Sequence, residues 1–240
     1  MNINKTIKAE RIIKELKLKS NLERKNILQR FFKTGKGEYG EGDIFLGVTV
    51  PEIRKIAKKY SSISFIEINK ILKTRIHEQR LVALLILVEK YDKSNQKQKE
   101  IIFNFYIKNT KYINNWDLID VTAPKIIGDY IFHNSNKKRI LYEFAKSNNL
   151  WKKRISIIST YYFIKNQRYN ETLIISKILL FDKHDLIHKA VGWMLREVGK
   201  QEQKILEIFL KEYFHNMPRT MLRYAIEKFP EKKQKYYLRK

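Results

Sequence analysis

Apolar residues along most of this chain recur with the spacing of an α-helix. Residues 81–88 give the clearest case, because they follow the i, i+3, i+4, i+7 pattern at Leu81, Leu84, Leu85 and Val88. Residues 155–162 follow it in a looser form. The alternation of apolar and polar residues that is typical of a strand is scarce. This pattern predicts an all-α protein.

Prolines and glycines mark the ends of the predicted helices. Five of the eight glycines lie between Gly35 and Gly47, which predicts one substantial loop there. Residues 35–40 of this loop match GxGxxG, but a dinucleotide site needs a strand before that motif and a helix directly after it. Here a helix ends near residue 33 and the next waits for Pro51, so we interpret the motif as part of the loop. All four prolines fit helix starts, where a missing N–H costs no hydrogen bond: Pro51, Pro124, Pro218 and Pro230.

Similar segments recur along the chain at a nearly constant spacing. A basic residue opens an apolar helix at Arg80, Arg154 and Lys189, which are separated by 74 and 35 residues. Half of 74 is 37, which predicts another unit near position 117. Units of about 35 to 40 residues with two helices each are typical of HEAT-like repeats, which stack into a curved α-solenoid. We expect a single HEAT-like domain over residues 1–240, with irregular helices over 1–76 and more regular repeats from about 77 to 240.

The charge of the chain favours a polyanionic partner. Lys and Arg number 50 against 25 Asp and Glu, so the net charge is +25. Self-repulsion on this scale costs stability unless a polyanion relieves it. A bias toward lysine codons would not by itself leave half as many acids as bases. Nucleic acid is therefore the leading partner, and an anionic membrane surface is a weaker alternative.

Several classes of site are absent from the sequence. The chain has no cysteine, which excludes disulfides and thiolate metal sites. His184 and His188 are spaced i, i+4 and could share a metal, but no HExxH motif accompanies them, so we interpret them as a hydrogen-bonded or solvated pair. We expect neither a metal nor a cofactor. The N-terminus lacks a signal-peptide pattern and no apolar run reaches the roughly 20 residues of a membrane span, so we expect a cytoplasmic protein.

The repeats predict which side chains share a face. Equivalent positions of stacked units line up along a concave groove. Trp116 and Asp120 are spaced i, i+4 on one helix face. The remaining residues near a unit's start supply an indole and several cations: Arg154, Lys189, Trp193 and Arg196.

Asp120 is the exception in this basic set. Pro124 follows four residues later, so Asp120 is expected near a helix C-terminus, where the helix dipole disfavours an anion. Such a departure often marks function. A salt bridge to Arg154 or a cap at the helix joint explains it equally well. Likewise Trp116 and Trp193 could be plain core, and Arg154 alone could be a phosphate contact or a solvated charge.

These residue types suit the cleavage of an N-glycosidic bond. Breaking that bond builds positive charge on the sugar. A carboxylate can stabilise this charge or position a water to attack the sugar. Indole faces also stabilise cations. A normal purine would need a general acid to leave, whereas an alkylated purine already carries positive charge. One carboxylate with aromatic neighbours therefore suffices for a cationic lesion.

The chain resembles the AlkD family of DNA alkylation repair proteins, which are HEAT-like-repeat DNA glycosylases. The similarity runs from roughly residue 20 to the end. It is carried by these stretches, in order: 39–54 (YGEGDIFLGVTVPEIR), 115–124 (NWDLIDVTAP), 150–154 (LWKKR), 187–197 (IHKAVGWMLRE) and 217–228 (MPRTMLRYAIEK).

The resemblance implies a monofunctional enzyme that excises positively charged N3- and N7-alkylpurines from duplex DNA without flipping the base. It implies that Asp120 is the catalytic carboxylate, that Trp116 and Trp193 cradle the deoxyribose, and that Arg154 holds the backbone. Val50 stands where some relatives carry a hydroxyl. By position in the matching stretches and in the groove, we expect further DNA contacts from Tyr39, Thr49, Arg54, Lys153, Lys189, Arg196, Arg219 and Arg223.

Two other functions remain open from the sequence. Some relatives with this fold lack glycosylase activity, so the chain could be a non-catalytic protein that binds distorted duplex DNA. HEAT-like stacks also serve as scaffolds for peptides or acidic proteins, and fold alone does not decide among these. Nothing in the sequence demands more than a monomer.

Overall fold

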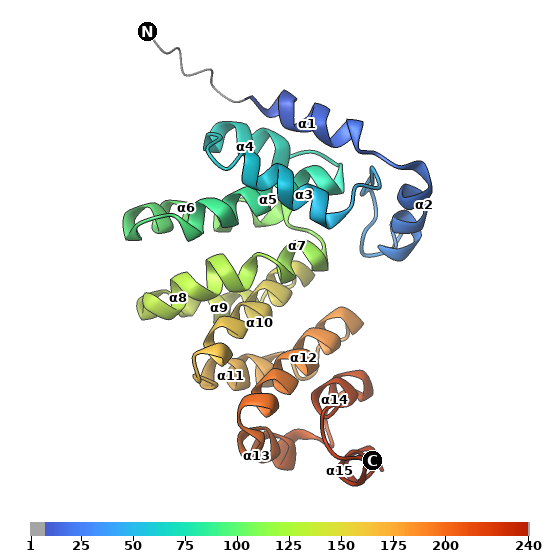
Figure 1. Cartoon of the computed structure of the whole chain (residues 1–240). Coiled ribbons are helices and arrows are strands. Elements are labelled where there is room, and N and C mark those ends of the chain that lie inside the picture. Colours follow the sequence, from blue (N-terminus) through green and yellow to red (C-terminus); the bar gives the residue numbers. More distant parts are fainter. Residues whose placement is uncertain (1–7, 240) are drawn as a thin grey trace. The chain divides into compact units, whose positions relative to one another are not determined.

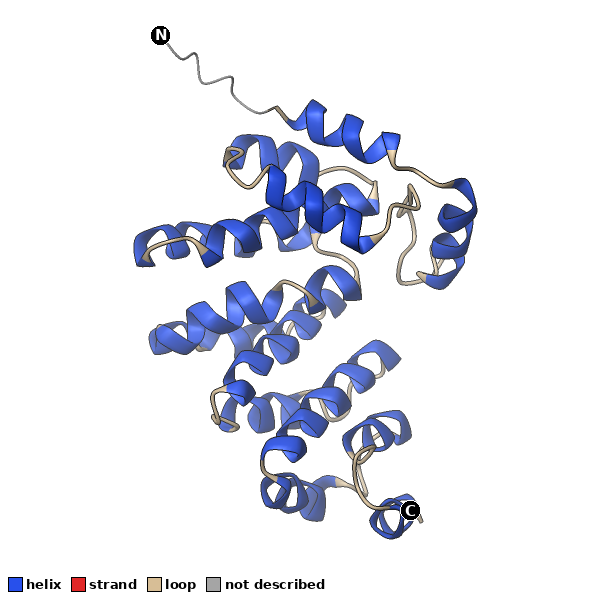
Figure 2. Cartoon of the chain, viewed as in Figure 1, coloured by secondary structure: helices blue, strands red, loops and turns tan. Residues whose placement is uncertain are grey.

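The computed structural model describes residues 8–239, in which helices joined by loops make up the protein (Figure 2). Within this range no strand forms, and Ile44 and Ile76 make an isolated parallel bridge. The all-α class predicted from the hydrophobic spacing is confirmed. The chain divides into two compact units, one up to Leu118 and one from Ile119 onward.

Unit 1 is built around α5 (His77–Asp92), which packs against α3 and α4 (Figure 1). All eight residues of the apolar run 81–88 are buried in this helix, as its length and hydrophobicity predict. The other helices of this unit are α1 (Ala9–Leu18), α2 (Leu22–Phe31), α3 (Val50–Lys59), α4 (Phe65–Leu72), α6 (Gln96–Lys108) and the 3-10 turn η1 (Thr110–Tyr112). The short helix α7 (Trp116–Asp120) contains the boundary between the units.

Unit 2 is built on α10 (Leu150–Lys165), which packs against α9, α11 and α12, while α12 in turn packs against α13 and α14 (Figure 1). Its apolar positions, including Ile155, Ile157 and Ile158, are buried. The other elements of this unit are the π-helix η2 (Pro124–Gly128), α8 (Asp129–His133), the 3-10 turn η3 (Ser135–Lys137), α9 (Arg139–Ala145), α11 (Asn170–Ile178), α12 (Asp185–Gln201), α13 (Gln203–Tyr213), α14 (Arg219–Ala225) and α15 (Glu231–Leu238).

The helices begin near the predicted unit starts. α5, α7, α10 and α12 each begin within four residues of positions 80, 117, 154 and 189, respectively. Three of these helices pack against the helix that follows them: α5 against α6, α10 against α11 and α12 against α13. The repeated unit read from the sequence is therefore a helix pair, except near 117, where α7 is followed by the π-helix η2.

The prolines and the glycine-rich loop also lie where they were predicted. Pro51 lies in the first turn of α3, Pro124 begins η2, and Pro218 and Pro230 directly precede α14 and α15. No helix occupies residues 32–49 between α2 and α3. In this loop Gly47 has φ +81°, and a Cβ there would lie 2.2 Å from the Asn21 carbonyl oxygen, so glycine is required.

Candidate active site

Asp120 forms a two-point ion pair with Arg154 within unit 2. Arg154 Nε donates to Asp120 Oδ1 at 2.9 Å and its Nη2 donates to Oδ2 at 2.7 Å. The remaining nitrogen, Nη1, donates to the Leu186 carbonyl oxygen at 2.7 Å, in the first turn of α12. One arginine thus joins the end of α7 to the start of α12. The salt bridge that the sequence left open as an explanation of Asp120 is confirmed.

The pair is largely buried, but its two side chains differ in their exposure to solvent. The Arg154 side chain is 6% exposed and the Asp120 side chain is 14% exposed, so the carboxylate is the more open member. Asp120 is the last residue of α7, as the following Pro124 predicted. The guanidinium compensates for the unfavourable helix dipole at this end. The result is an oriented carboxylate whose partner is held by a second contact.

Trp193 is half-buried on α12, two turns after its start. Its indole N–H donates to Glu197 Oε1 at 3.2 Å, and its ring centroid lies 6.2 Å from that of Tyr161 on α10. Glu197 also accepts from Lys200 at 2.7 Å. The indole is therefore fixed in orientation. It is only partly enclosed, so it is less buried than a residue of the core.

Trp116 belongs to unit 1 and is part of an aromatic cluster with the end of α2. Its ring stacks on Phe32 at 5.2 Å with an interplanar angle of 11°, and Phe31 meets its edge at 6.0 Å. The Asn115 side chain accepts the backbone N–H of Trp116 at 2.9 Å. Trp116 is half-buried: Phe32 supports its ring, but the ring is not enclosed in the core.

A buried polar network anchors the start of α7. His77 lies between two carboxylates: Nδ1 is 3.3 Å from Asp43 Oδ2 and Nε2 is 2.7 Å from Asp117 Oδ2. Arg80 Nη2 lies 2.6 Å from the same Asp43 oxygen, and Asn115 donates to it at 3.2 Å. The α2–α3 loop, α5 and the residue before α7 thus meet at the Asp43 carboxylate.

The network holds His77 as an imidazolium. Burial alone would lower the pKa of His77, but the charge and hydrogen bond of Asp117, with help from Asp43, raise the pKa to about 9. Burial opposes ionisation of Asp43 as well, yet His77 and Arg80 leave the pKa of Asp43 below its usual value. The His77 ring also stacks on Phe45 at 4.5 Å. Both ring nitrogens therefore act as donors.

Glu78 organises the loop that leads into α3. This buried carboxylate accepts three consecutive backbone N–H groups, from Leu46 at 2.9 Å, Gly47 at 2.7 Å and Val48 at 3.3 Å. The loop ends at Thr49, the residue before α3, whose side chain makes no capping bond and is partly exposed. Glu78 thus fixes the backbone that leads to Thr49, a predicted DNA contact.

A mainly apolar pocket of about 330 Å³ lies beside this loop in unit 1. Its lining includes Ile27 and Leu28 of α2 and Ile53 of α3, and it reaches Thr49 and His77. The predicted contact Arg54, also on α3, is exposed. Tyr39 is partly exposed, and its hydroxyl donates to the Phe31 carbonyl oxygen at 3.4 Å.

The predicted DNA-contacting cations differ in whether they already have a partner within the protein. Arg54 and Arg223 are exposed and form no hydrogen bond or ion pair with any described residue. The others have partners in unit 2: Lys153 with Asp182 at 2.6 Å, Lys189 with Asp185 at 2.7 Å, Arg196 with Glu227, and Arg219 with the Leu238 carbonyl oxygen at 2.6 Å.

The histidine pair of α12 is hydrogen-bonded, as interpreted from its sequence. His184 precedes the helix and its Nδ1 accepts the Leu186 N–H at 3.1 Å, while His188 Nε2 contacts the Asp182 carbonyl oxygen. Over residues 8–239 no three His, Asp or Glu side chains are grouped to hold a metal ion. None of the helices in that range combines the length and apolar character that crossing a membrane requires.

Comparison with known families identifies the family of this chain. The sequence profile of the family described as DNA alkylation repair enzyme matches residues 12–229. The chain belongs to this DNA alkylation repair family. Its general role is therefore the repair of alkylated DNA, and DNA is the substrate that the family implies. No curated protein sequence matches this chain significantly.

Solved structures of this family have the same fold. A predicted DNA alkylation repair enzyme from Enterococcus faecalis is 15% identical, with a TM-score of 0.69 over 89% of this chain and 98% of that one. AlkD2 from Streptococcus mutans is 20% identical, with a TM-score of 0.56 over 93% of this chain and 97% of that one. At these identities the likeness shows the helical fold.

Sequence reasoning missed the network of His77, Asp43 and Asp117. Its members are 34 and 40 residues apart and lie on three different elements, so no local pattern connects them. One signal was present: residues 77–80 are four polar residues directly before a wholly apolar run on one helix. All four are buried, and polar residues in that position need partners from elsewhere in the chain.

Proposed function

We propose that this chain is a monofunctional DNA glycosylase that hydrolyses the N-glycosidic bond of positively charged N3- or N7-alkylated purines in duplex DNA. It would act without cofactor, as a monomer, and without flipping the base. The family match supports a role in alkylation repair. The observation that carries the finer proposal is the Asp120–Arg154 pair, an oriented and partly exposed carboxylate on a strongly basic chain.

Asp120 is proposed to stabilise the oxocarbenium-like state of the deoxyribose or to position the attacking water. A fixed anion next to developing positive charge lowers the barrier because it needs no reorganisation when the charge forms. The cationic purine leaves as a neutral base and requires no general acid. Arg154 keeps the carboxylate oriented and supplies a positive charge for the neighbouring phosphate backbone.

Trp116 and Trp193 are proposed to cradle the deoxyribose of the lesion. An indole face attracts a cation, so it favours the charged nucleotide over a normal one. Both rings are half-buried and each is supported by another aromatic residue, Phe32 for Trp116 and Tyr161 for Trp193. Such support fixes the planes of the rings before DNA arrives and reduces the ordering cost of binding.

Base release tests the proposal. A duplex that contains 7-methylguanine is incubated with the full chain, and free base is measured by chromatography. We expect release by the wild type and a loss of about 100- to 1000-fold in Asp120→Asn, the size typical of removing one preorganised charge. Glu171→Gln is the matched control, because Glu171 is also a covered carboxylate paired with a cation, Lys138, in unit 2.

The outcomes separate the mechanism from its alternatives. Full activity in Asp120→Asn would overturn the proposed carboxylate role. Salt-sensitive DNA binding with no base release by the wild type would instead indicate a non-catalytic protein that binds distorted duplex. Failure to bind duplex at low salt would leave the scaffold function. No lysine nucleophile is proposed, so borohydride should trap no covalent adduct with DNA.

A further inference from the structure

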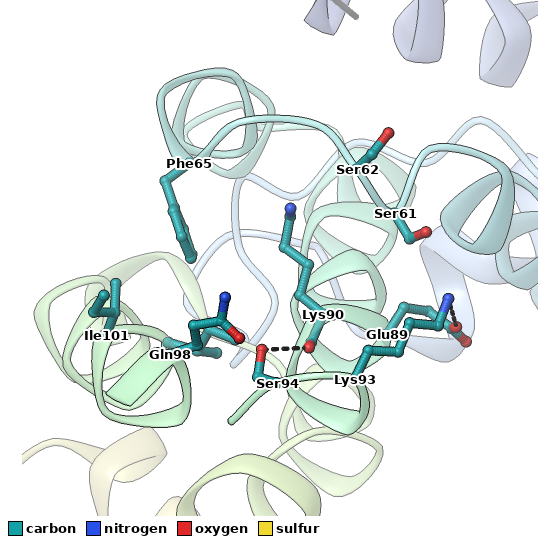
Figure 3. A pocket seen from close by; sticks show the side chains of 10 residues that line it. Ser61, Ser62, Phe65, Glu89, Lys90, Lys93, Ser94, Gln98 and Ile101 are labelled. Carbon is teal, nitrogen blue, oxygen red and sulfur yellow. Dashed lines mark hydrogen bonds and ion pairs between the residues drawn. The ribbon is translucent and has the colours of Figure 1, made fainter. Parts of the chain in front are cut away.

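A second pocket lies in unit 1 at the end of α5 that is remote from His77. It has a volume of about 340 Å³ and is formed by the turn before α4, the last turns of α5 and the first turns of α6. Figure 3 shows Lys90 at its centre, between Phe65 on one side and Ser61 on the other. The pocket takes no part in the proposed glycosylase mechanism.

Lys90 is a half-buried cation without a carboxylate partner. It forms no ion pair among residues 8–239, and its Nζ lies 5.7 Å from the centre of the Phe65 ring. Burial lowers the pKa of Lys90. Other partly covered lysines of the chain, such as Lys138 and Lys153, pair with carboxylates instead. An anion in this pocket would offset the desolvation of the ammonium group.

The remaining polar groups of the pocket are mainly free donors. The hydroxyls of Ser61 and Ser62 make no hydrogen bond with the described residues. Gln98 Oε1 already accepts the Asn95 N–H at 3.1 Å, so its NH₂ group remains available. The one carboxylate in the lining, Glu89, is matched by Lys93 at 3.9 Å. A lining rich in donors and carrying net positive charge suits an oxyanion.

The other wall of the pocket is apolar. Figure 3 shows the Phe65 ring and the Ile101 side chain beside Gln98, and Ile102 also lines the pocket. Ile101 is 55% exposed, so its side chain offers apolar surface to a ligand in this pocket. A ring packed on this wall would place an attached anionic group near Lys90. The volume is within the range of small-molecule pockets, about 300 to 1000 Å³.

We propose that this pocket binds a phosphate monoester that carries a planar ring, as a nucleoside monophosphate does. Lys90, Ser61 and Ser62 would hold the phosphate, and Phe65 and Ile101 would cover the ring. The same chemistry is found in a free nucleotide and in the 5′-phosphorylated end of a DNA strand. Lys90 follows His77 by 13 residues on α5, which separates the pocket from the His77 network by about 20 Å along the helix.

Calorimetric titration of the full chain with deoxyadenosine monophosphate tests the proposal. At about 0.15 M salt we expect saturable one-site binding, and binding at least about tenfold weaker for Lys90→Gln, because a charge-assisted contact is lost. Deoxyadenosine without the phosphate should bind correspondingly weaker. A Ser61→Ala, Ser62→Ala double variant should weaken binding by a smaller factor without touching the charge.

The control is Lys111→Gln, which removes an exposed lysine that also lies over an aromatic ring, Tyr112 at 5.0 Å, outside the pocket. If Lys111→Gln weakens binding as much as Lys90→Gln does, or if Lys90→Gln binds like the wild type, the pocket is not the site and the proposal fails. Base release by Lys90→Gln should remain at the wild-type rate, which keeps this test independent of the glycosylase proposal.

Competition distinguishes the two sources of the ligand. A trinucleotide with a 5′-phosphate and the same trinucleotide without it are each used to displace a fluorescent nucleotide from the chain. Displacement by the phosphorylated form alone supports a strand end as the occupant. Displacement by neither, with free nucleotide still bound, supports a small nucleotide. Equal displacement by both forms would contradict the phosphate requirement and overturn the proposal.

Discussion

The Asp120–Arg154 pair serves folding as well as the proposed chemistry. Arg154 uses three of its nitrogens and is almost fully covered, so its removal would leave a poorly solvated carboxylate and an unsatisfied Leu186 carbonyl. An arginine guanidinium can donate two parallel hydrogen bonds to a carboxylate, whereas a lysine ammonium has the charge but not this planar geometry. Loss of activity in Asp120 or Arg154 variants must therefore be separated from loss of stability.

Arg154→Ala is expected to destabilise the protein by about 3 to 5 kcal/mol, since it breaks a covered pair by removing one partner. Arg154→Lys should recover only part of this loss. Thermal unfolding followed by circular dichroism provides the measurement. Arg139→Ala is the control, because Arg139 pairs with Glu143 at the surface and is 86% exposed, so its melting temperature should hardly change. Equal melting temperatures for Arg154→Ala and the wild type would contradict the structural role.

His77 should make stability depend on pH on the alkaline side. Its pKa is raised from 6.5 to about 9, so its contribution is fully present below about pH 6.5 and is lost as the pH rises through 9. The shift corresponds to roughly 3 kcal/mol, or about 6 to 12 °C in melting temperature. Melting temperatures are compared between pH 6 and 10 for the wild type and His77→Gln. A parallel decline in both would show that His77 is not the responsible group.

At the scale of the elements, the course of the loop between α2 and α3 depends on glycine at position 47. Gly47 has φ +81° and no room for a Cβ, whereas Gly37 has φ +79° and nothing within 4 Å of a Cβ. Gly37→Ala should therefore cost about 1 to 2 kcal/mol, the left-handed penalty alone. Gly47→Ala should cost clearly more and also displace Thr49. Urea unfolding of the two variants measures the difference, and equal losses would contradict the clash.

The helices and their boundaries were largely predictable because hydrophobic spacing, proline and glycine act over a few residues. The run 81–88 and the loop 32–49 are examples. The joint after α7 was only partly predictable: Pro124 marked a restart, but nothing in the sequence distinguishes the π-helix that begins there from an α-helix. Long-range contacts were the least accessible. Arg154 was named as a partner of Asp120 only as one alternative, and Glu78 was not singled out at all.

For the whole molecule, the excess of 25 positive charges predicts that the proposed DNA binding depends steeply on salt. The six predicted DNA-contacting cations other than Arg154 are Arg54, Lys153, Lys189, Arg196, Arg219 and Arg223. If each of these contacts a phosphate, the logarithm of affinity should fall with a slope of about −5 in the logarithm of salt concentration. Arg223→Gln should reduce this slope by about one, since Arg223 is exposed and has no partner among residues 8–239. Arg196→Gln should change it less, because Arg196 is already paired with Glu227. Fluorescence anisotropy over a salt series measures the slope for each variant. A larger change for Arg196→Gln than for Arg223→Gln would contradict the prediction.

The way α2 is attached predicts where proteases cut the protein first. This ten-residue helix has no buried residue and is tied to the following loop by polar contacts, such as Arg24 Nε to the Gly47 carbonyl oxygen at 2.9 Å. Segments with few apolar contacts open locally at little cost, and proteases cut what opens most often. We therefore expect α2 to exchange its amide hydrogens first and to receive the first cut. Degradation would then be governed by this helix and would be largely insensitive to changes in the two cores.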